Sequence, residues 1–95
     1  MISVIRSFKD ADAFELIVNR KHRKYANVLS SILRKLDALE AAVELAEMKG
    51  PPGNRLEALK GSRTGQHSIR VNDQFRICFT WKDDGAYDVE IVDYH

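Results

Sequence analysis

The chain has 95 residues, 44% of them hydrophobic and 31% charged, which is the composition of one small globular domain. Its 15 basic and 14 acidic residues leave a formal net charge of +1. This excludes an overall positive field that holds nucleic acid, so any anion site must be a local patch. The single cysteine, Cys78, cannot form an internal disulfide, and the sequence contains no signal-peptide pattern or membrane-length apolar run. These features predict a cytoplasmic protein that does not contact a membrane.

The first part of the chain predicts a short strand followed by a helix. Residues 2–8 mix β-branched and polar side chains, and Asp10 can cap a helix that begins near Ala11. The apolar side of that helix is expected to consist of Phe14, Leu16, Ile17 and Val18. The basic run 20–24 then interrupts it, either as a solvated connection or as a patch that touches phosphate or an acidic partner.

A long helix is expected over residues 24–49. Apolar side chains recur there at steps of three and four and form a core-facing stripe: Tyr25, Val28, Leu29, Ile32, Leu36, Leu39, Val43 and Ala46. The sequence Gly50-Pro51-Pro52-Gly53 predicts the end of the helix, because proline cannot continue it and glycine takes a left-handed turn. Residues 55–65 are expected to be irregular, and they lack the glycine-lysine-serine order of a phosphate-binding loop.

The last third predicts three strands over residues 67–71, 75–81 and 87–92, joined by turns at 72–74 and 82–85. One parity of these strands should pack on the long helix: Ile69, Val71, Ile77, Phe79, Trp81, Val89 and Ile91. The other parity should form an uncovered face: Ser68, Arg70, Asn72, Arg76, Cys78, Thr80, Glu90 and Tyr94.

The groups on and around the expected uncovered face suit RNA. Arg70 and Arg76 carry guanidiniums that bind phosphate through forked donors, and the rings of Phe75 and Tyr94 offer planes for unstacked bases. Further polar groups flank the face, with Lys60, Arg63 and His67 on the loop that leads into it and Asp93 and His95 at its edge.

These groups are sufficient for cleavage of RNA without a metal or other cofactor. His95 can act as base or acid because imidazole titrates near neutrality, and the carboxylates of Asp93 and of the chain end should favour its protonated form. Arg70 and Arg76 would stabilise the charge on the phosphorane. Lys60 would add charge or act as the acid.

Structural alternatives stay open for the same residues. Arg70 can form a cross-strand ion pair with Glu90, and Arg76 can pair with Asp73. His67 can be a loop residue that forms only local hydrogen bonds.

Three stretches resemble HigB-type toxins of the RelE/ParE superfamily of bacterial toxin–antitoxin modules: residues 51–61 (PPGNRLEALKG), 65–77 (GQHSIRVNDQFRI) and 89–95 (VEIVDYH). The resemblance implies a single RelE/HigB-like toxin domain over residues 1–95. Its fold would be α+β and microbial-ribonuclease-like, with a small mixed or antiparallel sheet and N-terminal helices packed on one face.

The resemblance also implies an activity and partners. The protein would be an endoribonuclease that cuts mRNA in the A site of the 70S ribosome. A HigA-type antitoxin with a helix-turn-helix domain would neutralise it, and operator DNA would be contacted only through that antitoxin. By position, the catalytic residues are Lys60, Arg76, Asp93, Tyr94 and His95, with Arg70 in the same patch.

Glu57 departs from the pattern, because some members have a histidine there, and this departure places more of the proton transfer on His95. Two other functions remain possible on the same fold. One is a non-catalytic, ParE-like binder of gyrase. The other is an inactive module whose basic face only holds its antitoxin.

Overall fold

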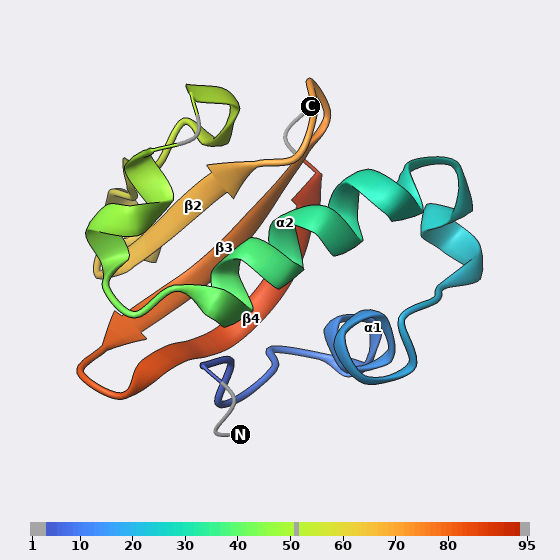
Figure 1. The fold of residues 1–95 in the computed structure, drawn as a ribbon, viewed down its shortest axis with the longest axis horizontal. Coiled ribbons are helices and arrows are strands. Elements are labelled where there is room, and N and C mark those ends of the chain that lie inside the picture. Colours follow the sequence, from blue (N-terminus) through green and yellow to red (C-terminus); the bar gives the residue numbers. More distant parts are fainter. Residues whose placement is uncertain (1–3, 51, 94–95) are drawn as a thin grey trace.

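A computed structural model describes residues 4–50 and 52–93 of the protein (Figure 1). One sheet contains four strands in the order β1-β2-β3-β4, and every neighbouring pair is antiparallel. The strands are β1 (Glu57–Ala58), β2 (Gln66–Arg70), β3 (Phe75–Lys82) and β4 (Gly85–Asp93). Helix α2 (Leu29–Ala41) crosses one face of the sheet, and α1 (Ala11–Phe14) lies beside β4. The expected α+β architecture is confirmed.

The segment before α1 runs along β4 but does not form the predicted strand. In the described part, residues 4–8, it makes two isolated parallel bridges, Ile5 with Ala86 and Phe8 with Val89. The ladder is interrupted between them because Asp88 has a left-handed φ of 53° and donates its N–H to the hydroxyl of Ser7 at 2.9 Å. The prediction of a first strand is therefore wrong for these residues, and residues 2–3 lie outside the described chain.

The predicted cap of the first helix is confirmed. The side chain of Asp10 accepts a hydrogen bond from the backbone N–H of Ala13 at 2.9 Å. The helix continues as η1 (Glu15–Asn19), whose wider turns change the direction of its side chains. Leu16 is buried as expected, but Phe14 and Val18 are 45% and 53% exposed, so the predicted apolar side is only partly correct.

The predicted long helix is instead three helices: η2 (Arg23–Val28), α2 and η3 (Leu45–Lys49). The backbone is extended at Ala42 and Glu44. There the Glu47 carboxylate accepts the backbone N–H groups of Val43 and Glu44 at 2.5 and 2.6 Å, in a capping box that begins η3. Within the described ranges, no helix has the length and apolar character needed to cross a membrane.

The helix break shifts which side chains are buried. The stripe is confirmed up to Leu39, but Val43 is 81% exposed and Ala46 is also exposed. Ala42 and Met48 occupy the core instead. Helix η3 ends at Lys49 as predicted, yet Gly50 keeps a right-handed φ of −57°, so the expected left-handed turn is wrong there.

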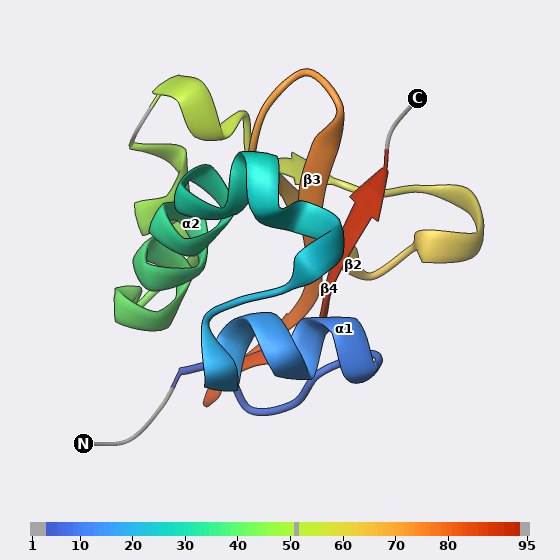
Figure 2. The same ribbon diagram turned by 90° about the vertical axis from the view of Figure 1, so that its right-hand side faces the viewer.

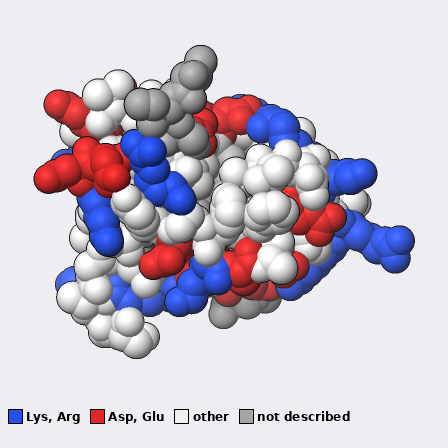
Figure 3. All heavy atoms as spheres, turned by 90° about the horizontal axis from the view of Figure 1, so that it is seen from below, with Lys and Arg blue, Asp and Glu red and all other residues white. Residues whose placement is uncertain are grey.

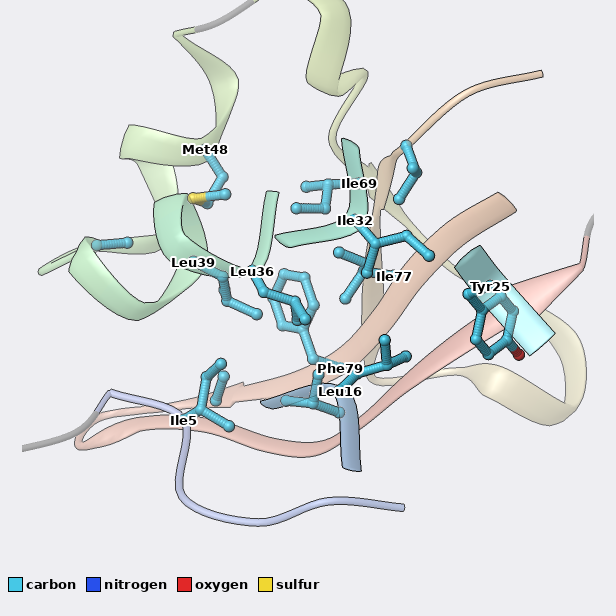
Figure 4. Close-up of a cluster of buried hydrophobic side chains, with 14 residues drawn as sticks. Ile5, Leu16, Tyr25, Ile32, Leu36, Leu39, Met48, Ile69, Ile77 and Phe79 are labelled. Atoms are coloured by element: carbon cyan, nitrogen blue, oxygen red, sulfur yellow. The ribbon is translucent and has the colours of Figure 1, made fainter. Parts of the chain in front are cut away.

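The core lies between α2 and the sheet (Figure 4). Ile32, Leu36 and Leu39 of α2 face Ile69, Ile77 and Phe79 of the sheet. All seven residues predicted for the core-facing parity belong to this cluster or pack against it. The strand prediction therefore placed the apolar face correctly.

One irregularity sets the direction of β4 side chains. Residues Cys78 and Thr80 of β3 pair with Glu90 and Tyr87, so one residue of β3 stands opposite two of β4. The extra residue, Asp88, forms a β-bulge. Because of it, Ala86 rather than Tyr87 faces the core.

Candidate functional site

The two arginines at the centre of the predicted site are brought together. Arg70 of β2 and Arg76 of β3 are direct cross-strand partners. They lie on the outer face, which we define as the face of β2–β4 that points away from α2. Figure 2 shows α2 on one side of the sheet and the loop that follows β1 on the other.

The outer face is not uncovered, contrary to the prediction. Ser68 and Cys78 have no exposed surface at all, and Arg76 is only 8% exposed. The side chain of Arg76 itself fills the space over Ser68, and residues of the loop after β1 reach across β3 to β4. The segment 55–65, expected to be irregular, also contains β1, which extends the sheet beside β2.

Arg76 is held by an array of acceptors. Its Nε donates to the hydroxyl of Ser68 at 2.8 Å, and an Nη2 hydrogen bond of 2.6 Å reaches the carbonyl of Arg55. The carboxylate of Glu57 lies 3.6 Å from the same nitrogen, with the Glu57 side chain 56% exposed. This geometry fixes the plane of the guanidinium, so its charge is positioned before any ligand arrives.

The carbonyl that holds Arg76 is itself fixed. Arg55 has a positive φ of 44°, and the preceding residue, Asn54, is 1% exposed. The amide of Asn54 donates to the carbonyl of Met48 at 3.1 Å and accepts from the ammonium of Lys35. Burial lowers the pKa of Lys35, and the charges of Arg34 and Arg70 lower it further.

The ion pairs differ from both structural alternatives. Glu90 pairs with Arg63 at 3.0 Å rather than with Arg70. Asp73 pairs with Arg70 rather than with Arg76. The reason is local: Arg70 and Asp73 lie three residues apart around one turn, and Arg63 approaches β4 from the loop.

Two residues predicted to bind RNA point to the other side of the sheet. His67 belongs to β2, not to a loop, and stands opposite Phe79, against which its ring stacks at 6.4 Å. Phe75 packs edge-on against Tyr25 of η2 at 5.4 Å. Neither side chain joins Arg70 and Arg76, because odd-numbered positions of β2 and β3 face α2.

The remaining predicted residues lie at the margin of the site or beyond the described chain. Lys60 is exposed just before η5 (Gly61–Arg63). Asp93 is the cross-strand partner of Phe75, which places it on the face toward α2 rather than beside Arg76, and it accepts a hydrogen bond from Gln74 at 3.1 Å. Tyr94 and His95 lie outside the described residues. Within residues 4–50 and 52–93, no three His, Cys, Asp or Glu side chains gather as a metal site requires.

The basic run 20–24 has local partners. Arg20 forms an ion pair with Asp37 of α2 at 2.9 Å, and the hydrogen bond from Arg20 lowers the pKa of the Asp37 carboxyl. His22 contacts Asp12 at 2.8 Å and accepts the backbone N–H of Lys24. These contacts favour the solvated helix connection over a phosphate-binding patch.

Comparison with known sequences decides the family. The profile of HigB-like toxins, described as RelE-like toxin of type II toxin-antitoxin system HigB, matches residues 4–95. The chain belongs to this family. Toxin HigB-1 of Vibrio cholerae is 41% identical over 66 residues, which cover 68% of this chain and 70% of that protein. Endoribonuclease HigB of Proteus vulgaris is 36% identical over 61 residues, with coverages of 64% and 65%.

Solved structures agree with this HigB-like assignment at the level of the fold. The chain resembles the YoeB-YefM complex from Staphylococcus aureus with a TM-score of 0.57 at 20% identity, over 96% of this chain and 97% of that chain. A heterotetrameric YoeB-YefM complex from the same organism gives 0.50 at 23% identity, with the same coverages. The expected RelE-like fold is confirmed. As the toxin of a type II toxin–antitoxin system, the protein has an antitoxin as its partner.

Proposed function

We propose that the protein is a metal-independent, ribosome-dependent endoribonuclease that cuts mRNA in the A site and thereby inhibits translation and growth. We further propose that a HigA-type antitoxin with a helix-turn-helix domain neutralises it. The observation that carries the proposal is the fixed guanidinium of Arg76, in a family whose Proteus vulgaris relative is named an endoribonuclease. A positively charged group held in place beside a sheet face suits a reaction that develops charge on phosphorus.

The reaction would proceed by attack within the RNA. The 2′-oxygen forms a bond to phosphorus while its proton passes to a base, and the bond to the 5′-oxygen breaks as that oxygen gains a proton from an acid. Arg76 would stabilise the phosphorane between these two steps. A phosphate that approaches Arg76 has to compete with Glu57, and because that carboxylate is 3.6 Å away and more than half exposed, the competition costs little.

The roles of the other residues rest on the resemblance. Lys60 would supply a second positive charge, and Asp93, Tyr94 and His95 would complete the site, with His95 as base or acid. Val92, next to Asp93, is the cross-strand neighbour of Arg76. Strand β4 therefore ends beside Arg76, with Val92 on the face of Arg76 and Asp93, the partner of Phe75, on the face toward α2.

The test is in vitro translation of a defined message, with cleavage mapped by primer extension. We expect position-specific cuts that require ribosomes. Arg76→Lys keeps the charge but loses the forked donors, and we expect it to slow cleavage about 100-fold, the usual cost of removing one preorganised donor group. Arg23→Lys, the same change at an exposed arginine elsewhere, is the matched control. Thermal unfolding of each variant separates loss of activity from loss of fold.

The same assay tests His95 and separates the candidate functions. We expect His95→Gln to abolish cleavage while leaving the melting temperature and antitoxin binding unchanged. Growth arrest that survives in this variant would exclude His95 from catalysis. Arrest accompanied by DNA gyrase inhibition and intact mRNA would instead identify a ParE-like binder.

A further inference from the structure

We infer that Arg63 is a positioning residue rather than an RNA contact. Its ion pair with Glu90, which we call the clasp, holds the loop that carries Lys60 in place across the outer face. The inference rests on the proposed function, because it concerns how Lys60 reaches the site. We call residues 59–65 the Lys60 loop.

The contacts of Arg63 span the sheet. Its Nη1 donates to the side-chain oxygen of Gln66 at 3.1 Å and to the carboxylate of Glu90 at 3.0 Å. Gln66 begins β2, and Glu90 lies on β4 opposite Cys78 of β3. One guanidinium therefore bridges the two strands that flank β3, above a cysteine with no exposed surface.

Burial makes this ion pair hard to exchange for a phosphate. The side chains of Glu90 and Arg63 are 13% and 34% exposed. A phosphate that captured Arg63 would leave the Glu90 carboxylate largely buried without its cation, which is strongly unfavourable. The pair of Arg76 differs in its acid: the side chain of Arg76 is 10% exposed, but that of Glu57 is 56% exposed and would not be left buried without its cation. Arg63 and Arg76 therefore have different tasks.

The backbone of the Lys60 loop is organised around the clasp. Before Lys60, the N–H of Leu59 donates to the carbonyl of Gln66 at 2.8 Å; after it, the N–H of Arg63 donates to the carbonyl of Lys60 at 3.3 Å. Gly61 and Gly65 turn the loop with left-handed φ values of 64° and 95°. The hydroxyl of Thr64 also donates to the carbonyl of Gly61 at 2.7 Å. These bonds join the loop to itself and to β2, whereas the side chain of Arg63 ties it to β4.

The experiment is a charge swap. We would compare Arg63→Ala, Glu90→Ala and the double variant Arg63→Glu/Glu90→Arg in single-turnover cleavage of mRNA on programmed ribosomes. Arg23→Ala and Asp83→Ala, both exposed, serve as charge-matched controls. A second readout is the rate of trypsin cleavage after Lys60, which reports the opening of the loop without reference to RNA.

If the clasp positions Lys60, each single variant loses about tenfold or more in the maximal cleavage rate, as small displacements of a catalytic group do. The protein concentration at half-maximal rate stays unchanged, and trypsin cuts the loop faster. The swap restores both rate and protection, because the pair rather than either residue is what matters. Rescue of the rate would not follow from a general loss of stability.

Three results would overturn the inference. Unchanged trypsin protection in both single variants would mean that no clasp exists. A raised half-maximal concentration in Arg63→Ala alone, without rescue by the swap, would identify Arg63 as an RNA contact. Normal cleavage despite an opened loop would leave the clasp without a role in positioning. If the wild-type protein does not cut mRNA on ribosomes, the proposed function itself fails, and the trypsin result still reports whether the clasp forms.

Discussion

Each arginine of the outer face has a carboxylate beside it in the structure: Arg63 has Glu90, Arg70 has Asp73 and Arg76 has Glu57. The exposure of the acid distinguishes these pairs. An exposed carboxylate can turn into solvent and release its arginine to a phosphate. A buried carboxylate that released its arginine would keep its negative charge in the protein interior without a positive partner. The exposure of the acid therefore predicts which ion pair a phosphate can open, and it favours the pairs of Arg76 and Arg70 over that of Arg63, while the side chain of Arg76 itself is only 10% exposed.

Asn54 is the residue whose loss should most directly loosen the support of Arg76. It is 1% exposed and joins Lys35 to the carbonyl of Met48. Asn54→Ala removes both of these buried or half-buried hydrogen bonds, so we expect the free energy of unfolding to fall by about 1–3 kcal/mol. Urea unfolding measures this change, with Asn27→Ala, an exposed site, as the control. A change as small as that of the control would show that solvent replaces the amide without cost.

The hairpin between β3 and β4 predicts a pH dependence. The hydroxyl of Tyr87 donates to the carboxylate of Asp84 at 2.7 Å. This bond lowers the pKa of the Asp84 carboxyl and raises the pKa of the Tyr87 hydroxyl. Because the carboxyl pKa is lower in the folded protein, the bond stabilises the fold fully at pH values above the unfolded-state pKa of about 3.9. That stability is lost as pH falls through the folded-state pKa. A raised tyrosine pKa gives stability that is present below about pH 10 and lost as pH rises through the folded pKa.

Tyr87→Phe tests this window. We expect the variant to unfold at lower urea concentration than the wild type at neutral pH, and the difference to shrink toward zero under strongly acidic conditions, where Asp84 is protonated. Arg6 and Lys82, which also lower the pKa of Asp84, remain in both proteins. A difference that persists unchanged in acid would mean that packing of the ring, not the hydrogen bond, sets the effect.

At the scale of elements, the spacing of apolar residues along the sequence predicted the strands well and the helices less well. Ile69, Ile77 and Phe79 carry the period-two signal and lie in the core as expected. The helix break was not predicted because the stripe continues in phase through Val43, while the capping box formed by Glu44 and Glu47 acts against it. A short-range hydrogen-bond pattern prevailed over periodicity there.

The covering of the outer face was also missed, and the reason is different. Alternation states which side chains share a face, and Arg70 and Arg76 do share one. It cannot state what lies above that face, because the Lys60 loop is placed by a long-range contact, from Arg63 to Glu90, 27 residues apart. The side on which His67 lies did not depend on such a contact: His67 is two residues before Ile69 in the same strand, so alternation places both on the face toward α2.

The contact between the N-terminal segment and the β3–β4 hairpin leads to a prediction about how these elements pack. Gly85 has a φ of 142°, and a Cβ atom added there would lie 2.1 Å from the carbonyl oxygen of Val4. Gly85→Ala must push the segment away from β4, so we expect a loss of about 1–3 kcal/mol in the free energy of unfolding, as for other overpacked sites. Amide hydrogen exchange should show faster exchange at Arg6 and Ala86, whose N–H groups bond across this junction. Gly53→Ala, where a Cβ meets only the far end of Lys35 at 3.9 Å, is the control.

At the scale of the whole molecule, the distribution of charge bears on the proposed dependence on the ribosome. The face in Figure 3 has Lys and Arg interspersed with Asp and Glu rather than gathered in a field of one sign. With a formal net charge of +1, the protein has little long-range attraction for RNA. The local cluster around Arg76 is small, so productive binding would need the ribosome to present the message.

We therefore expect weak and only mildly salt-dependent binding to free single-stranded RNA. The dissociation constant should be on the order of 10⁻⁵ M or weaker near physiological salt, within the range of non-specific contacts. Fluorescence anisotropy with a labelled oligonucleotide over a series of KCl concentrations measures both the constant and its slope. Because few phosphates can be neutralised at once, the slope should correspond to about three ion contacts or fewer, and Arg70→Ala should reduce it by about one. Submicromolar binding with a steep slope would mean that the protein finds RNA through its own field, and the argument for dependence on the ribosome would lose its physical basis.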